Sequence, residues 1–398
     1  MTKMNIPYGR QTIDQDDIDA VVDALKSDFM TQGPRIPEFE KVVAEYHGCQ
    51  YAVAFCNGTA ALHACYHAAG LKPGEEFITS PITFAASANG GLYVGGIPRF
   101  VDIDEGDFCI DLDRIEAAIT PKTRVITPVS YAGFPVDLKR LRAIADRHGL
   151  TIIHDAAHAI GARREGRSVS EHADMTILSF HPVKHVATGE GGMVLTDRED
   201  LYRKLILFRT HGITRDAALL QKNEGAWYYE MQELGYNYRI TDLQCALGTS
   251  QMKKLDHSLF RRNEIARSYK EALGHLDWLQ LPEYGFDTSW VEDPVYRDLA
   301  KKPADLHAYH LYPVRVRDAA RRKDFFDHLR AAGVFVQVHY IPVHTMPYYR
   351  DTFGFKAGDF PKAERFYAQE VSLPMYPALT GDQLAYVVES IHGFERGA

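Results

Sequence analysis

The first half of this chain alternates short apolar runs with stretches whose apolar residues recur at helical spacing. Helical spacing predicts amphipathic helices, whereas short apolar runs between turn residues fit buried strands. Strands that are buried on both faces and joined by helices form a mostly parallel sheet with helices on its two sides. The pattern therefore predicts an α/β fold. The runs expected to form strands are Tyr51–Phe55, Phe77–Ser80, Arg99–Ile103, Arg124–Ser130, Thr151–His154, Met175–Phe180 and Gly192–Thr196.

The second half has a different pattern, which indicates a second and smaller domain. One long helix is expected from Thr241 to Gly274. The Pro-bearing, acidic stretch Pro282 to Asp305 follows, and we interpret it as a loop between domains. Strand and helix patterns after Tyr309 then indicate an α+β unit. Two domains agree with a length of 398 residues, and we place a large domain at residues 1–255 and a small C-terminal α+β domain at residues 256–398.

Composition excludes several classes of protein. The net charge of −8 provides no basic surface for nucleic acid or an anionic membrane, so an anionic substrate needs a local cluster of donors. Met1 to Arg10 lacks an apolar signal segment and no run approaches 18 apolar residues, so we expect a cytoplasmic protein without a membrane span. The five cysteines show no C-x-x-C spacing, which predicts free thiols and neither a disulfide framework nor a metal site.

A lysine at a strand end is the strongest indication of chemistry. Lys184 lies in the segment S-F-H-P-V-K-H, which is followed by the glycine-rich T-G-E-G-G. A single lysine is usually exposed, but a desolvated one loses its proton and can form a Schiff base. Upstream, Asp155 ends an apolar run, where a carboxylate needs a cation or hydrogen-bond donors. A pyridinium nitrogen is such a partner, so Lys184 and Asp155 together indicate pyridoxal phosphate.

A third element fits the phosphate of that cofactor. After the run Tyr51–Phe55, Asn57, Gly58 and Thr59 open an Ala-rich helix. A glycine allows close backbone approach, and the first N–H groups of a helix attract anions. Such junctions are common in α/β proteins, so this indication is weak by itself. Phe84 is, by itself, more often a core residue than one that stacks on a cofactor.

Six short motifs occur in order: T-Q-G-P-R from Thr31, N-G-T-A-A-L from Asn57, D-A-A-H from Asp155, S-F-H-P-V-K-H from Ser179, T-G-E-G-G-M from Thr188 and G-Y-N-Y-R-I-T-D from Gly235. With these motifs the chain resembles, along nearly its whole length, the sugar-nucleotide aminotransferases of the DegT/DnrJ/EryC1/StrS family. The resemblance implies the aspartate-aminotransferase type fold (fold type I), a homodimer, and pyridoxal 5'-phosphate bound at the dimer interface.

The resemblance also implies roles for individual residues. Lys184 matches the lysine that binds the cofactor covalently, and Asp155 matches the partner of the pyridinium nitrogen. Phe84 matches the aromatic residue that stacks on the ring, and His158 holds a second ring-contacting position. The implied phosphate ligands are Gly58, Thr59, Ala60 and Ser179, with Asn237 from the other subunit.

Finer segments resemble the subgroup that aminates C4 of a UDP-linked 2-acetamido-2,6-dideoxy-4-hexulose, a precursor of pseudaminic acid. These are Val129–Gly133, the H-L-Y-P motif from His310, and the strand-like segment Gln337–His344 with His339 and Tyr340. We expect Thr31, Gln32, His339 and Tyr340 to contact substrate, although a simple turn or an edge strand are the alternatives. The expected donors to the diphosphate are Arg35, Arg209, His211 and Arg239, and the expected amino donor is glutamate.

Other readings stay open at this point. Family members that carry histidine in place of the lysine are dehydratases, but Lys184 is present here. Another 3- or 4-keto nucleotide sugar, including a dTDP-linked one, is a second candidate substrate. A non-catalytic regulator that binds pyridoxal phosphate is a third reading, which the presence of both Lys184 and Asp155 disfavours.

Overall fold

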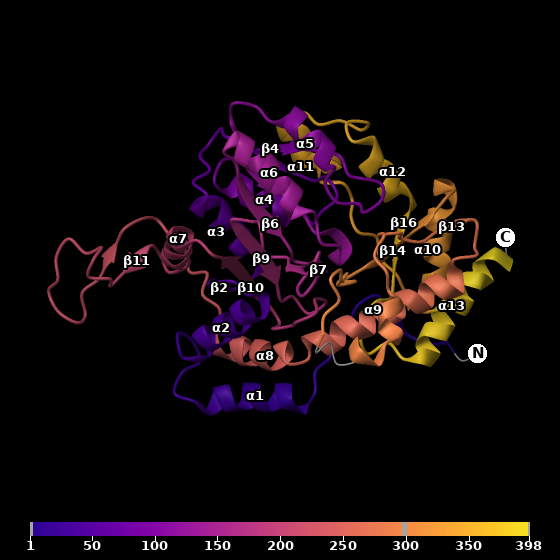
Figure 1. Ribbon diagram of the computed structural model, residues 1–398, viewed down its shortest axis with the longest axis horizontal. Helices are drawn as coiled ribbons and strands as arrows, with labels where there is room; N and C mark the ends of the chain where they lie inside the picture. The colour runs from indigo at the N-terminus through magenta and orange to yellow at the C-terminus, as the bar shows by residue number, and fades with distance from the viewer. Residues whose placement is uncertain (1–2, 297–300, 397–398) are drawn as a thin grey trace.

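The computed structural model describes residues 3–296 and 301–396, and a seven-stranded sheet forms its centre (Figure 1). The strand order is β2-β10-β9-β6-β5-β3-β4. Neighbouring strands are parallel, except that β10 is antiparallel to both β2 and β9. The mostly parallel sheet confirms the α/β fold class. Its strands are β2 (Tyr51–Phe55), β3 (Glu76–Thr79), β4 (Ile97–Phe100), β5 (Thr123–Thr127), β6 (Thr151–Asp155), β9 (Met175–Ser179) and β10 (Gly192–Thr196).

Helices cover both faces of the sheet, as the buried strand pattern requires. Successive residues of β10 enter different hydrophobic clusters, because side chains alternate between the faces of a strand. Met193 and Leu195 join a cluster with α2 and α8, whereas Val194 joins one with α3 and α7. The helices of the first 252 residues are α1 (Gln15–Lys26), α2 (Arg35–His47), α3 (Gly58–Ala68), α4 (Ala86–Tyr93), α5 (Leu112–Ala118), α6 (Leu138–His148), α7 (Glu199–Arg209) and α8 (Asp242–Met252).

Local sequence sets several helix ends. The side chain of Asp14 accepts a hydrogen bond from the backbone N–H of Asp17, and the side chain of Asp17 accepts one from the backbone N–H of Asp14. Helix α1 therefore begins with a capping box. Gly48 ends α2 in the left-handed conformation (φ 71°), where glycine pays no steric penalty. Both signals are local in the sequence.

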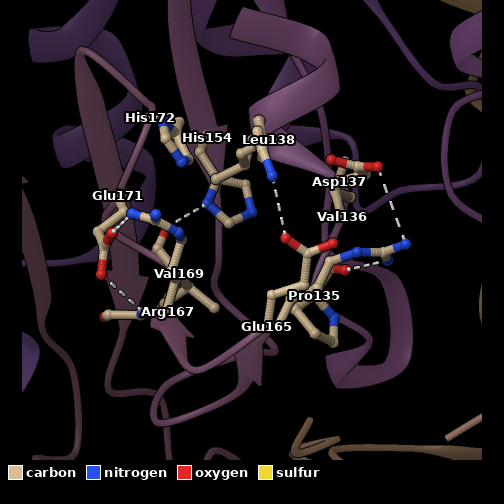
Figure 2. Close-up of a pocket in the computed structure, with 13 residues that line it drawn as sticks. Pro135, Val136, Asp137, Leu138, His154, Glu165, Arg167, Val169, Glu171 and His172 are labelled. Carbon is tan, nitrogen blue, oxygen red and sulfur yellow. Dashed lines mark hydrogen bonds and ion pairs between the residues drawn. The ribbon is translucent and has the colours of Figure 1, made fainter. Parts of the chain in front are cut away.

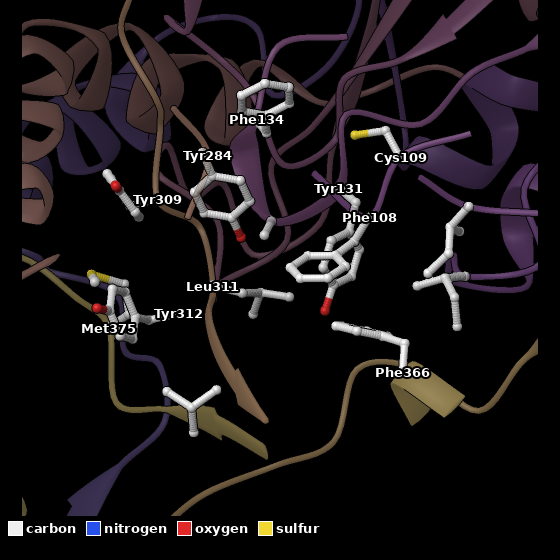
Figure 3. Packing of buried hydrophobic residues seen from close by; sticks show 14 of the residues in the cluster. Phe108, Cys109, Tyr131, Phe134, Tyr284, Tyr309, Leu311, Tyr312, Phe366 and Met375 are labelled. Carbon is white, nitrogen blue, oxygen red and sulfur yellow. The ribbon is translucent and has the colours of Figure 1, made fainter. Parts of the chain in front are cut away.

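The C-terminal part carries a three-stranded antiparallel sheet, ordered β13-β14-β16. Its aromatic core is continuous with the large part: Phe108 and Tyr131 pack in one cluster with Phe366 and Tyr312 (Figure 3). The N-terminal strand β1 (Ile6–Pro7) also pairs with β15 (Val334–Phe335). The division at residues 255 and 256 stays a prediction. The remaining elements are α9 (Leu255–Leu273), β13 (Leu279–Gln280), β14 (Tyr312–Val316), α10 (Arg322–Ala331), α11 (Pro347–Phe353), α12 (Pro361–Gln369), β16 (Glu370–Leu373) and α13 (Gly381–Arg396).

Two expectations from the sequence need correction. The single helix from Thr241 to Gly274 is wrong, because α8 ends at Met252 and α9 begins at Leu255. Lys254 lies at the break, where its ammonium group pairs with Asp14 and the buried Asp17, and these tertiary contacts override helix propensity. The stretch Pro282 to Asp305 is also not plain loop, since it contains short 3-10 turns at Ser289–Glu292 and Pro294–Tyr296; residues 297–300 lie outside the described residues.

An arm that the sequence did not predict projects from the body, at the left of Figure 1. It follows α7 and contains β11 (Ile213–Thr214) paired antiparallel with β12 (Glu230–Met231). Its apolar side chains Trp227, Met231 and Leu234 are 64–74% exposed in the single chain. In residues 3–296 and 301–396, no helix combines the length and the apolar character that crossing a membrane requires. The cytoplasmic location stays a prediction.

Candidate active site

A cavity of about 500 Å³ lies at the carboxyl ends of the parallel strands, the usual position for a ligand in an open α/β sheet. We call it the Lys184 cavity. Its walls come mainly from four regions: the first turn of α3, the segment with Phe84 and Ser87 at the start of α4, the ends of β6 and β9 with the loop at Lys184, and the C-terminal residues His310, His339 and Tyr340. The fold thus brings together residues that lie more than 250 positions apart.

Lys184 follows β9 and is half-buried in this cavity. Its Nζ atom lies 3.3 Å from Nε2 of His310. The pKa of Lys184 is lowered to about 7, mainly by burial; the carboxylate of Asp155 acts to raise it, and the nearby Arg262 guanidinium acts to lower it. A lysine with a pKa of about 7 is roughly half neutral at pH 7, and only the neutral amine is a nucleophile or a base.

Asp155 is the last residue of β6, and it is almost fully buried. Its Oδ2 accepts a hydrogen bond from Ser87 Oγ at 2.6 Å, and its Oδ1 accepts one from the backbone N–H of Ala157 at 3.0 Å. Burial raises the pKa of Asp155, while the two donors and the charge of Lys184 act to lower it. The carboxylate is therefore oriented by neutral donors and keeps lone pairs for a cationic partner in the cavity.

The first turn of α3 presents free backbone donors to the same cavity. The side chain of Asn57 accepts a hydrogen bond from the N–H of Ala60. The N–H groups of Gly58 and Thr59 precede the first hydrogen bond within the helix, so they can donate to a ligand. A Cβ atom on Gly58 would lie 3.3 Å from Cβ of Ser179, so glycine permits the close approach of these two segments. This cradle suits a phosphate group.

Two rings line the space between the phosphate cradle and the C-terminal wall. Phe84 is 62% exposed in the single chain, which is unusual for a large apolar side chain that borders a cavity. His158 is buried, and its Nε2 lies 3.1 Å from the hydroxyl of Tyr340. Among the described residues, Nδ1 of His158 has no hydrogen-bond partner. The donors, the carboxylate and the two rings together fit pyridoxal phosphate.

The structure brings most of the expected site residues to this cavity. Those that line it are Gly58, Thr59, Phe84, Asp155, His158, Ser179, Lys184, His339 and Tyr340. Other expected residues lie outside it in the single chain: Thr31, Gln32, Arg35, Ala60, Arg209, His211, Asn237 and Arg239. Within the chain, Arg209 pairs with Glu40 at 2.7 Å and donates to the carbonyl of Ala54, and Asn237 is exposed beside the base of the arm.

Sequence reasoning missed two contacts of the reactive pair. Ser87 bonds Asp155 across 68 positions of sequence, and nothing in its neighbourhood distinguishes it from other small residues of a helix start. The sequence singles out His310 only as part of the H-L-Y-P motif, although it contacts Lys184 directly. Its place in this motif is the signal that the sequence offers.

A second, much smaller cavity of about 30 Å³ lies between α6 and the β7–β8 hairpin (Arg163–Arg164 and Arg167–Ser168). Figure 2 shows that its charged residues are paired with one another. Lys139 lies 3.3 Å from Glu165, and Arg167 lies 2.8 Å from Glu171. It has room for only one or two water molecules, so it is not a candidate site for a cofactor.

Comparison with known proteins identifies the class. Residues 11–392 match the model of the DegT/DnrJ/EryC1/StrS aminotransferase family. The chain is 38% identical to the spore coat polysaccharide biosynthesis protein SpsC of Bacillus subtilis, over 99% of this chain and 98% of the relative. It is 34% identical to a UDP-4-amino-4,6-dideoxy-N-acetyl-beta-L-altrosamine transaminase of Campylobacter jejuni, over 97% of this chain and 96% of the relative.

Solved structures agree with this family. PseC of Helicobacter pylori, an aminotransferase of pseudaminic acid biosynthesis, superposes with a TM-score of 0.89 at 29% identity, over 99% of this chain and all of that chain. A sugar aminotransferase described as putative, from Streptococcus pneumoniae, matches in a PLP form with a TM-score of 0.87 at 28% identity, over 99% of each chain.

The chain belongs to the DegT/DnrJ/EryC1/StrS aminotransferase family. It has the fold of the pyridoxal phosphate-dependent aminotransferases, uses that cofactor, and is a sugar aminotransferase.

Proposed function

We propose that this enzyme transfers an amino group from L-glutamate to C4 of a UDP-2-acetamido-2,6-dideoxy-4-hexulose, a step toward pseudaminic acid. The observation that carries the proposal is one cavity that joins Lys184 and Asp155 to His339 and Tyr340 of the C-terminal segment. The Campylobacter jejuni relative and the Helicobacter pylori structure support the choice of sugar.

When bound, pyridoxal phosphate supplies a ring that accepts the electrons of a carbanion. The chain's own residues hold and use that ring. The N–H groups of Gly58 and Thr59 bind the phosphate at the start of α3. Asp155, held by Ser87 and Ala157, keeps the ring nitrogen protonated, and Phe84 and His158 orient the ring.

Lys184 moves the proton in both half-reactions. Its lowered pKa provides a neutral amine that takes a proton from the amino-acid donor and returns one during amination of the sugar. His310, at 3.3 Å from Nζ, limits where this amine can lie. A non-catalytic regulator would not need a half-buried, partly neutral lysine facing an oriented carboxylate.

A different keto-sugar is the second candidate. SpsC of Bacillus subtilis is more similar in sequence, at 38% identity, than the Campylobacter jejuni relative at 34%, and its name refers to spore coat polysaccharide biosynthesis. A 3-keto or a dTDP-linked sugar is therefore the alternative substrate.

The test is a panel of keto-sugars. The purified enzyme is loaded with cofactor and glutamate, and each UDP- or dTDP-linked 3- or 4-keto sugar is added. Mass spectrometry and NMR then identify the amino-sugar product. Preference for the UDP-2-acetamido-2,6-dideoxy-4-hexulose with amination at C4 supports the proposal, and a clear preference for another sugar contradicts it. Lys184→Ala is the control for uncatalysed reaction.

We further propose a homodimer in which each active site is shared. The exposed apolar side chains of the arm suit burial against a second copy, and Asn237 lies at its base, outside the Lys184 cavity of its own chain. In this arrangement Asn237 reaches the cofactor phosphate of the partner. Arg239 lies two residues further on, and it can serve the sugar diphosphate from the same side.

A subunit-mixing experiment tests the shared site. Asn237→Asp places a carboxylate beside the phosphate, so this homodimer should bind cofactor poorly. Lys184→Ala should bind cofactor without turnover. In a hybrid dimer one site carries both changes and the other carries neither. Activity should therefore return on mixing, towards about a quarter of the wild-type value under random exchange. Hybrids that form but stay inactive would show that each site is built within one chain.

A further inference from the structure

A chain of buried polar groups leads from the C-terminal sheet into the Lys184 cavity. Ser372 Oγ lies 2.5 Å from Oε1 of Glu370 and 2.9 Å from Nδ1 of His339. Glu370 and Ser372 are fully buried, and His339 is 8% exposed, at the cavity wall. The three groups therefore connect a carboxyl group that has no contact with solvent to a ring that borders the substrate space.

The backbone holds these groups in register. Ser372 and Gln337 exchange two backbone hydrogen bonds, which fixes the segment of His339 beside β16. Oε2 of Glu370 accepts from the N–H of His339 at 2.8 Å, and the hydroxyl of Tyr131 donates to the carbonyl of His339 at 2.6 Å. Hydrogen bonds thus hold both the backbone N–H and the carbonyl of His339, which fixes the position of its ring. The nitrogen that carries the ring proton is not fixed by these bonds.

Two proton arrangements satisfy the chain of bonds. If Glu370 is protonated, its O–H donates to Ser372, the Ser372 hydroxyl donates to Nδ1 of His339, and the imidazole carries its proton on Nε2. If Glu370 is ionised, Ser372 donates to the carboxylate and accepts from Nδ1–H, which leaves Nε2 as an acceptor. None of the hydrogen bonds of His339 within the described residues uses Nε2, so this atom is available to a ligand.

We propose that Glu370 and Ser372 are positioning residues that set the tautomer of His339 and pass a proton through it to the carbonyl oxygen of the bound keto-sugar. This inference rests on the proposed function in placing the sugar beside His339. Nε2–H gives its proton to the oxygen, Nδ1 takes the proton of Ser372, and Ser372 takes that of Glu370. One N–H and two O–H bonds break, and one N–H and two O–H bonds form. A carboxylate remains on Glu370 until solvent in the cavity returns a proton by the reverse path.

The charges around the relay favour the donor arrangement near neutral pH. Burial raises the pKa of Glu370 to about 8, against the lowering effect of its hydrogen bonds and of Arg322. The other ionisable groups that face it are Tyr131 and Tyr340. Arg315 is its backbone register partner in the β14–β16 ladder, but the guanidinium of Arg315 lies over the ring of Phe108. Glu370 is thus mostly protonated at pH 7.

His339 itself stays neutral over the same range. Burial, and then the charge of Lys184, lowers the pKa of His339 to about 3. Because the ring is not a cation, the choice of tautomer alone decides whether Nε2 is a donor or an acceptor. The protonation of Glu370, and not that of His339, therefore decides whether the cavity wall presents a donor or an acceptor at Nε2 of His339.

The first test needs no sugar. Histidine labelled with ¹⁵N in the holoenzyme reports the tautomer of His339, whose signal is the one missing from His339→Gln among the 18 histidines. The wild type should carry its proton on Nε2 below a pH of about 8 and on Nδ1 above it. Glu370→Gln should stay in the Nε2–H form at all pH values. A tautomer that is independent of pH in the wild type would overturn the relay.

The second test separates the half-reactions. Glu370→Gln and Ser372→Ala should slow the sugar half-reaction on the order of 10²-fold, typical of losing a general acid, with the glutamate half-reaction unchanged. Ser372→Thr keeps the hydroxyl and should restore the rate. Glu364→Gln is the matched control, because it makes the same change of carboxylate to amide 3.0 Å from the buried His344, away from the cavity.

The outcomes distinguish the relay from the proposed substrate. If the wild type aminates no keto-sugar at C4 but shows the tautomer change, the proposed substrate fails and the relay stands. If the variants lose the tautomer change yet aminate the sugar at the wild-type rate, proton delivery is wrong.

Discussion

Replacing Gly192 by alanine should weaken cofactor binding, although this residue touches no expected ligand. Gly192 begins β10 and pairs with Phe55 on one side and Ser179 on the other. A Cβ atom there would lie 2.6 Å from the carbonyl carbon and oxygen of Asn57, and 2.8 Å from the nitrogen of Gly58. Both neighbours are backbone atoms in the turn that forms the phosphate cradle, so no flexible side chain can move aside.

The size of the effect follows from these distances. Ordinary contacts of a Cβ atom begin near 3.4 Å, so the turn must move by about 0.8 Å. A hydrogen bond of about 2.9 Å from Gly58 or Thr59 to the phosphate would lengthen beyond about 3.5 Å and be lost. One bond to a charged group is worth roughly 1.5–3 kcal/mol, which corresponds to about 10- to 150-fold weaker binding.

The assay is a titration of the cofactor-free protein with pyridoxal phosphate, followed by absorbance. Circular dichroism and the melting temperature verify that the variant is folded. Gly381→Ala is the control, because a Cβ atom at this residue of α13 meets no atom within 4 Å. A folded Gly192→Ala protein with an unchanged dissociation constant would refute the placing of the phosphate on this turn.

Three further predictions concern the reactive pair and the buried carboxyl group. Lys184→Ala should reduce turnover by several orders of magnitude without changing the fold or the melting temperature. Near-normal steady-state turnover in this variant would show that Lys184 has no role in the mechanism. Asp155→Asn should retain cofactor but slow both half-reactions, because an amide does not hold the pyridinium proton; equal single-turnover rates in variant and wild type would make Asp155 structural. Glu370→Gln should change the pH dependence of stability. Since the native pKa of Glu370 is raised to about 8, the native state keeps a proton that the unfolded chain releases near its ordinary pKa of about 4.3, so this group makes the unfolding free energy fall as pH rises between these values. The melting temperature of the variant relative to wild type should therefore be higher at pH 7.5 than at pH 5, and an equal difference at both pH values would contradict the raised pKa.

Much of the fold followed from local sequence. Short apolar runs predicted all seven strands of the mostly parallel sheet within a few residues, and the runs at β2 and β10 match their strands end to end. Helix ends at Asp14 and Gly48 were also local signals. The pairing of β10 antiparallel between β2 and β9 was not visible, because strand direction depends on which partners meet in space.

The break between α8 and α9 shows why a helical pattern alone is insufficient. The apolar spacing continues through Lys253 and Lys254, so nothing local ends the helix there. The ion pairs of Lys254 with Asp14 and Asp17 join residues about 240 positions apart, and only the packed structure brings these charges together. The exposed arm after α7 was not predicted because its two short strands are too short to show an apolar periodicity.

The chemistry of the site divides in the same way. By itself the sequence determined the residue types that the reaction needs, because Lys184, Asp155 and the Asn57–Thr59 turn each stand at a strand end where ligands bind in α/β proteins. Only the tertiary structure decided what surrounds them. Ser87 on Asp155, His310 on Lys184, and Ser372 with Glu370 behind His339 come from distant segments. A pKa depends on burial and on neighbours within a few ångströms, and neither quantity exists until the chain has folded.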